Sequence, residues 1–354
     1  MKEIDMLAMA RTNGFRLGNA QDRQGGTGCT VLVFPESAPC AVDVRGGGPA
    51  SRESELLNPM AAASGIHAIL LSGGSAFGLN ASAGVMQYLE EQHIGFDTRI
   101  CKVPLVVESC IYDLGCGDNV RPDAAMGYAA CQASESGDFR QGCYGAGTGA
   151  TVGKLCGPDY MMKSGLGAYA VQVGDLQVGA VVAVNAVGDV LDENGQILAG
   201  MRSRDGQGFA DTRRVMLEEA GQTPTLFSQR AVGTTTNTTI GAVVTNGQFD
   251  KAQLKKIAAL GSNGAKTKAH YCASKAGVIS LVKSLAMELA PYGIRANGVA
   301  PGPVQGTMIP KESWPVIAEK VPLNRLGTPE EMAEGAWFLC SPQAAFITGH
   351  ILDI

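Results

Sequence analysis

The segment from Gly233 to Ile240, GTTTNTTI, leads from a run of threonines into an apolar, β-branched stretch. Thr238 opens the predicted strand 238–246. A Ser, Thr or Cys in such a place becomes a nucleophile when the chain cuts itself directly before it. The freed α-amine, of pKa about 7.7–8.0, can then take the proton from the residue's own side chain. The branched Cβ of Thr238 limits χ1 and helps hold the hydroxyl in place. The alternative, a Thr-rich edge segment without chemistry, stays open.

The sequence offers few of the residues that other catalytic or ligand-binding motifs need. The histidines, at positions 67, 93, 270 and 350, show no HExxH or paired-ligand spacing, so we expect no metal site. They also make a Ser-His-Asp triad a weak candidate. Gly145–Ala150, GAGTGA, fits GxGxxA but follows RQGCYGA instead of a strand, and Gly153-Lys154 lacks the remaining residues of a phosphate loop. We therefore interpret these glycines as turn residues.

Composition excludes several classes of protein. Of the 354 residues, 45% are hydrophobic and 17% charged, and the net charge is −5, so a disordered chain and a nucleic-acid binder are both disfavoured. No run reaches the ~18 apolar residues of a membrane span, and the first residues do not read as a signal peptide. The ten cysteines form no CxxC pair, which favours reduced, mostly buried thiols and a cytoplasmic location.

The predicted elements indicate an α/β protein. We expect two short strands over 28–45, a buried strand at HAILLS, a helix over 75–92, and a hairpin over 167–191. The strand at 238–246 reads as buried on both faces, and a helix follows it. Near the C-terminus, Thr328 and Glu331 form a predicted capping box for a helix over 329–340. The character of the sequence changes near residue 261 without a linker.

Residues 15–258 resemble the L-aminopeptidase/D-esterase (β-aminopeptidyl peptidase) family of self-processing N-terminal nucleophile hydrolases. The stretches that carry the resemblance occur in the family's order: FRLGNAQD, GGTGCTVLVFPE, AVDVRGGGPASRESELLNP, HAILLSGGSAFGLNASAGVMQYLEE, GTGATVGK and NTTIGAVVTN. The resemblance implies an αββα sandwich, cleavage between Asn237 and Thr238, and Thr238 as nucleophile of the new chain. It makes Asn185, in VVAVNAVGD, a donor to the oxyanion, whereas the alternative for Asn185 is a turn residue at a strand end. It also places a substrate-side tyrosine within a residue or so of Tyr112.

Residues 261–354 resemble the C-terminal part of a short-chain dehydrogenase/reductase. Tyr271 and Lys275 give that family's YxxxK, and AGVISLVKSLAMELAPYGIRANGVAPGPV and RLGTPEEMAEGAWFLCSPQAAFITGHILDI follow it. In the family the Tyr donates a proton, and the Lys lowers its pKa and binds the nicotinamide ribose. The first strands and the glycine-rich cofactor loop have no counterpart here, so we expect no cofactor and expect Tyr271 and Lys275 to be vestigial.

These resemblances predict a chimera: a truncated hydrolase domain over 1–260 and a partial Rossmann-like reductase segment over 261–354. The hydrolase part lacks the later segment with a Ser/Glu pair and covering elements, so both parts would expose apolar faces. We expect a self-processing hydrolase acting on small peptides, amides or esters, with Thr238 and Asn185 as its catalytic residues. The resemblance also implies a homo-oligomer. A nicotinamide-dependent reductase fragment and an inactive chimera are the alternatives.

Overall fold

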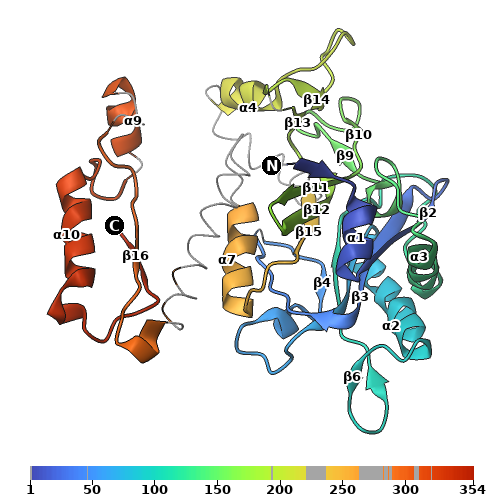
Figure 1. The fold of residues 1–354 in the computed structure, drawn as a ribbon. Helices are drawn as coiled ribbons and strands as arrows, with labels where there is room; N and C mark the ends of the chain where they lie inside the picture. Colours follow the sequence, from blue (N-terminus) through green and yellow to red (C-terminus); the bar gives the residue numbers. More distant parts are fainter. Residues whose placement is uncertain are drawn as a thin grey trace. The chain divides into compact units, whose positions relative to one another are not determined.

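The computed structural model describes residues 2–45, 47–192, 194–220, 237–262, 282, 286, 289–306, 311–319 and 321–354. The chain divides into two compact units, Met1–Ser262 and Asn263–Ile354. Helices and strands occur in both units (Figure 1), which confirms the α/β class. It stays a prediction that these units correspond to the truncated hydrolase domain over 1–260 and the reductase segment over 261–354.

A five-stranded sheet forms one half of the first unit. Its order is β2-β3-β5-β8-β4, and only β5 and β8 run parallel. Its strands are β2 (Arg16–Asp22), β3 (Thr27–Ala38), β4 (Ser51–Arg52), β5 (Ile66–Ser72) and β8 (Val106–Cys110). The stretch expected to form two strands over 28–45 instead forms the single long strand β3, and residues 39–45 are not in a strand.

Two helices, α2 (Ala81–Glu91) and α3 (Ala124–Ser136), cover one face of this sheet (Figure 1). The helix expected over 75–92 begins as a 3-10 turn, Ser75–Asn80, because Gly74 and Ser75 both have positive φ. Small residues let the two helices touch: a Cβ on Gly84 would lie 1.7 Å from the carbonyl oxygen of Ala124. The small-residue pattern of α2 therefore serves contact with a second helix as well as with the sheet.

The other half of the first unit is an antiparallel sheet in the order β1-β11-β12-β15. Its strands are β1 (Lys2–Ile4), β11 (Leu166–Val173), β12 (Leu176–Asn185) and β15 (Thr238–Thr245), with helix α1 (Met6–Asn13) following β1. One core cluster contains Leu32 and Leu71 of the first sheet together with Val181 and Ala242 of the second, so the two sheets share a buried layer. The sandwich architecture of the family remains an expectation that this shared core supports.

Strand β15 is buried on one face only, and the expectation of two buried faces is wrong. Ala242 and Val244 are 6% and 8% exposed, whereas Val243 between them is 51% exposed. Alternate residues of a strand point to opposite faces of a sheet. Thr238 has the parity of Ala242, and it therefore lies on the inward face.

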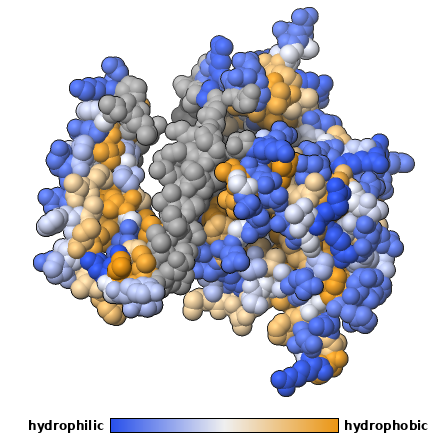
Figure 2. All heavy atoms as spheres, in the orientation of Figure 1, coloured by the Kyte–Doolittle hydropathy of each residue, from blue (hydrophilic) through white to orange (hydrophobic). Residues whose placement is uncertain are grey.

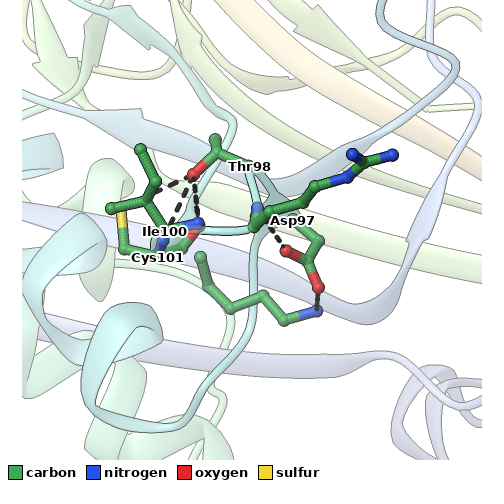
Figure 3. A network of polar contacts seen from close by, with 6 residues as sticks. Asp97, Thr98, Ile100 and Cys101 are labelled. Atoms are coloured by element: carbon green, nitrogen blue, oxygen red, sulfur yellow. Dashed lines mark hydrogen bonds and ion pairs between the residues drawn. The ribbon is translucent and has the colours of Figure 1, made fainter.

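Short elements complete the first unit. A hairpin of β6 (Phe96–Asp97) and β7 (Lys102–Val103) has its tip fixed by Thr98 (Figure 3): its hydroxyl donates to the Cys101 carbonyl and accepts from the Cys101 and Ile100 amides. Gly145–Gly147 forms a 3-10 turn, as expected for turn glycines. The other elements among the described residues of this unit are η1 (Ser54–Leu57), β9 (Thr151–Val152), β10 (Met162–Lys163), β13 (Val190–Leu191), β14 (Ile197–Ala199), α4 (Thr212–Ala220) and α7 (Lys251–Ser262).

The described part of the second unit contains a two-stranded parallel sheet and the helix α10 (Pro329–Cys340) beside it. Thr328 and Glu331 make the predicted capping box at the start of α10, and the Arg295 guanidinium donates to the Leu339, Cys340 and Ser341 carbonyls at its end. The other elements are η4 (Ala290–Tyr292), β16 (Gly298–Ala300), η5 (Lys311–Ser313), α9 (Trp314–Ala318), η6 (Pro342–Ala344) and β17 (Ile351–Asp353).

Large apolar side chains of the second unit reach the surface. Trp337, Leu323 and Phe346 are 73%, 74% and 104% exposed, and Figure 2 shows apolar surface on this unit. Exposed apolar faces were expected from the incomplete reductase segment. Among the described residues, no helix is long and apolar enough to cross a membrane.

Glu108, in the middle of β8, is 2% exposed, and the Ser72 hydroxyl donates to its Oε1 at 2.8 Å. Burial raises the pKa of Glu108, outweighing hydrogen bonds from Ser72 and Ser82 and the charge of Arg52. The folded state therefore holds this proton more tightly than the unfolded chain does.

The unfolding free energy should accordingly fall as pH rises from about 4.5 through the folded-state pKa of Glu108. Glu108→Gln should remove this part of the decline, measured as the difference between wild type and variant in urea unfolding at several pH values. Glu91→Gln is the control, because the pKa of the exposed Glu91 is lowered by its hydrogen bonds to Tyr128 and Gln87 and cannot produce a decline of this sign. If the difference in unfolding free energy between wild type and Glu108→Gln does not vary with pH, the raised pKa of Glu108 is contradicted.

Candidate active site

The register of the second sheet brings the two predicted catalytic residues together. Thr238, the first residue of β15, lies directly opposite Asn185, the last residue of β12. Opposed residues of antiparallel strands have Cα atoms about 4.5–5.5 Å apart. Both residues lie on the inward face, where Asn185 is fully buried and Thr238 is partly exposed.

The Asn185 amide has a fixed orientation. Its Oδ1 accepts from the Thr151 backbone N–H at 3.1 Å, from the Thr151 hydroxyl at 3.3 Å and from Lys154 Nζ at 2.5 Å. Its Nδ2 donates to the Tyr112 carbonyl at 2.8 Å. The donor nitrogen and the acceptor oxygen are thereby distinguished, and the side chain cannot rotate without losing all of these bonds. These bonds tie the end of β12 to two other stretches of the chain, 151–154 and Tyr112.

Lys154 is a candidate residue that the sequence analysis did not single out. It follows β9, and its ammonium contacts both the side-chain and the backbone oxygen of Asn185, at 2.5 and 3.5 Å. Burial lowers the pKa of Lys154 to about 8, against a smaller opposing effect of the Asp113 carboxylate. At mildly alkaline pH this amine can therefore exchange a proton. The stretch GTGATVGK carried the signal, since it contains both Thr151 and Lys154.

The loop that follows β8 forms another side of the site. Asp113 is buried, and its carboxylate accepts from the Thr27 hydroxyl at 2.8 Å and the Gly74 amide at 2.6 Å. A Cβ on Gly73 would come within 2.0 Å of Asp113 Oδ2, so only glycine fits there. Burial raises the pKa of Asp113, although these hydrogen bonds oppose the shift. The glycines of GGSAFGL thus hold this loop close to Asn185.

Three other residues were predicted to have a role in catalysis or processing. Asn237 directly precedes Thr238 and is partly buried. Tyr271 and Lys275 lie outside the described residues, so their vestigial character stays a prediction. Among the described residues, no group of His, Cys, Asp and Glu side chains could hold a metal ion.

Curated relatives match the first unit. An uncharacterized aminopeptidase of Mycobacterium bovis is 36% identical over 270 residues, covering 73% of this chain and 75% of the relative. A 6-aminohexanoate-oligomer endohydrolase of Kocuria is 35% identical over 246 residues, covering 69% and 65%. The chain spans between 64% and 75% of the length of these and another mycobacterial relative.

A different family matches the end of the chain. The model described as enoyl-(acyl carrier protein) reductase matches residues 248–354. A short-chain dehydrogenase structure from Bacillus anthracis is 44% identical over 24% of this chain and 33% of its own, with a TM-score of 0.21. The curated relatives and the family model confirm the two resemblances found in the sequence, and the chain joins segments that match two different families.

The first unit has a mixed α/β fold, and its curated relatives are named as aminopeptidases and amide-oligomer hydrolases. The chain belongs to the aminopeptidase family of the Mycobacterium bovis protein, which is the L-aminopeptidase/D-esterase family, and a reductase-like segment follows in the same chain.

Asn185→Ala would leave the Thr151 amide and hydroxyl, both buried, without their acceptor. A buried donor that loses its partner costs about 1–3 kcal/mol, so we expect the unfolding free energy of the first unit to fall by that amount. This loss of unfolding free energy is measured by urea unfolding, followed by far-UV circular dichroism. Thr151→Val removes only the hydroxyl donor and keeps the Oδ1 acceptor for the Thr151 amide, so it should cost less than Asn185→Ala; equal losses in both variants would contradict this assignment of the oxygen.

Proposed function

We propose that this chain is the precursor of an N-terminal nucleophile hydrolase that cuts its own Asn237–Thr238 bond and then hydrolyses small peptides, amides or esters. The observation that carries the proposal is the pairing of Thr238 with Asn185 on the inward sheet face, with the Lys154 amine hydrogen-bonded to the same asparagine. The αββα sandwich, a cytoplasmic location and a homo-oligomeric state belong to the same proposal. The free thiols of the described cysteines support the cytoplasmic location.

The self-cleavage step needs a base other than the α-amine, because the nitrogen of Thr238 is still in a peptide bond. In our proposal the Lys154 amine takes the Thr238 hydroxyl proton while Oγ1 attacks the Asn237 carbonyl carbon. The C–N bond breaks as the proton passes to the amide nitrogen, which becomes the α-amine of Thr238 and leaves an ester between the Asn237 carbonyl carbon and Oγ1. Water then hydrolyses that ester, which gives the Asn237 carboxylate and the free Thr238 hydroxyl.

Turnover repeats this chemistry on a substrate. The free α-amine of Thr238 accepts the hydroxyl proton, Oγ1 attacks the substrate carbonyl, and the protonated amine gives its proton to the leaving nitrogen or oxygen. Water hydrolyses the resulting acyl-threonine ester. The Asn185 side-chain N–H would stabilise the negative charge that develops on the carbonyl oxygen, an interaction whose loss costs about 10²–10³ in rate.

The intact mass of the denatured protein tests the first step. Wild type should give two species, residues 1–237 and 238–354, and Thr238→Ala should give one uncut species. Thr239→Ala is the matched control, since Thr239 is the next hydroxyl along β15 but lies on the opposite, exposed face. A single uncut wild-type species, or cleavage in Thr238→Ala, would refute the assignment.

Cleavage should depend on pH through Lys154. Its pKa of about 8 means that the neutral amine predominates only above that value, so the cleavage rate should rise with pH and level off above about 8. Lys154→Arg keeps a cation beside Asn185 but cannot lose its proton, and should slow cleavage at least about a hundredfold at pH 8 to 9. The time course of the two fragments on denaturing gels measures this. A variant that cleaves at the wild-type rate would show that Lys154 is not the base.

A further inference from the structure

The loop between β8 and α3, residues 111–123, is held in place from its start next to the candidate active site. The Ile111 carbonyl accepts from the Ser75 amide at 2.9 Å, and the Tyr112 carbonyl accepts from Asn185. Further along, Asp118 exchanges two hydrogen bonds with Gln24: its amide donates at 3.2 Å and its carboxylate accepts at 2.7 Å. Hydrogen bonds therefore connect the loop to the turn after β5, to the end of β12 and to the β2–β3 turn.

Arg121, near the end of this loop, stacks on Phe77 of the turn Ser75–Asn80. The guanidinium carbon lies 3.9 Å from the ring centroid, and both side chains are exposed. Stacking holds the planar group while leaving the N–H donors along its edge directed outward, and that fork matches a carboxylate. The Asp123 carboxylate is occupied by the Met126 amide at the start of α3. Within the described part of the chain, Arg121 makes no ion pair.

The charges around the site favour an anionic substrate group. Lys154 and Lys163 both interact electrostatically with the Asp113 carboxylate, which already accepts two hydrogen bonds. Lys163 itself donates to the Thr148 carbonyl and to Cys116 Sγ, at 3.3 Å for the latter. Arg121 is close to this carboxylate through its neighbour, because a Cβ on Gly74 would lie 2.8 Å from Cδ of Pro122 and the Gly74 amide donates to Asp113. The other carboxylates of the loop, Asp118 and Asp123, each accept a hydrogen bond.

We propose that Arg121, stacked on Phe77, binds a carboxylate of the substrate, so that the enzyme prefers amides and esters that carry a free carboxylate. This inference rests on the proposed hydrolase activity of Thr238. Arg121 acts here as a specificity residue and takes no part in bond breaking.

Two substrates with the same scissile bond test it: L-alanyl-4-aminobenzoate and its neutral analogue L-alanyl-4-aminobenzamide. Arg121→Gln should lower kcat/KM for the carboxylate substrate by about ten- to a hundredfold, mostly through KM, and change that of the neutral substrate less than about twofold. Phe77→Leu should give a smaller selective loss. Arg99→Gln, at the tip of the β6–β7 hairpin, removes an equal charge and should affect neither substrate. Equal effects of Arg121→Gln on both substrates would overturn the proposal.

Failure of the hydrolase activity can be told apart from failure of the subsite. If wild type hydrolyses neither compound, the proposed activity fails, and calorimetric titration with 4-aminobenzoate and 4-aminobenzamide then decides the subsite alone. Support would be a Kd at least about tenfold lower for the carboxylate in wild type, with the difference lost in Arg121→Gln. Equal affinities in wild type would reject the subsite.

Discussion

The buried amide of Asn185 is the interaction on which the candidate active site depends. Its Oδ1 accepts hydrogen bonds from Thr151 and Lys154, and its Nδ2 donates one to the Tyr112 carbonyl. Three separate stretches of chain thus meet at the end of β12, directly beside the first residue of β15. A buried primary amide is suited to this task because it offers a donor and an acceptor side by side, whereas a charged residue in the same place would carry a larger desolvation cost.

The surroundings of that amide explain the electrostatics of the site. Lys154 is drawn into the protein by Asn185, and the resulting loss of water lowers its pKa. Asp113 is enclosed among glycine backbones and is shifted in the opposite sense by the same cause. Burial therefore brings an amine and a carboxyl group closer together in proton affinity than they are in water, which is the usual condition for proton transfer near neutral pH.

Much of the first unit could be predicted from the sequence. The alternation in 167–191 predicted the hairpin of β11 and β12, although β12 ends at Asn185, and the branched residues of TTIGAVVT predicted β15. The pairing of Thr238 with Asn185 could not be read from either strand alone, since it depends on a long-range register. Lys154 was missed for a related reason: a lysine after a Gly-rich turn looks like a surface residue until tertiary structure buries it. The exposure of Val243 was misjudged because an apolar run does not reveal whether a second layer covers it.

The ladder between β12 and β15 pairs eight residues of each strand, from Val178 with Thr245 to Asn185 with Thr238. A break in the backbone just before Thr238 would remove none of these pairs. The protein would then become a noncovalent assembly of two chains, in which the smaller chain bears the new amino terminus at one end and the reductase-like unit at the other. If the second unit associates, precipitates or is degraded, the polypeptide that carries the nucleophile Thr238 would do so with it.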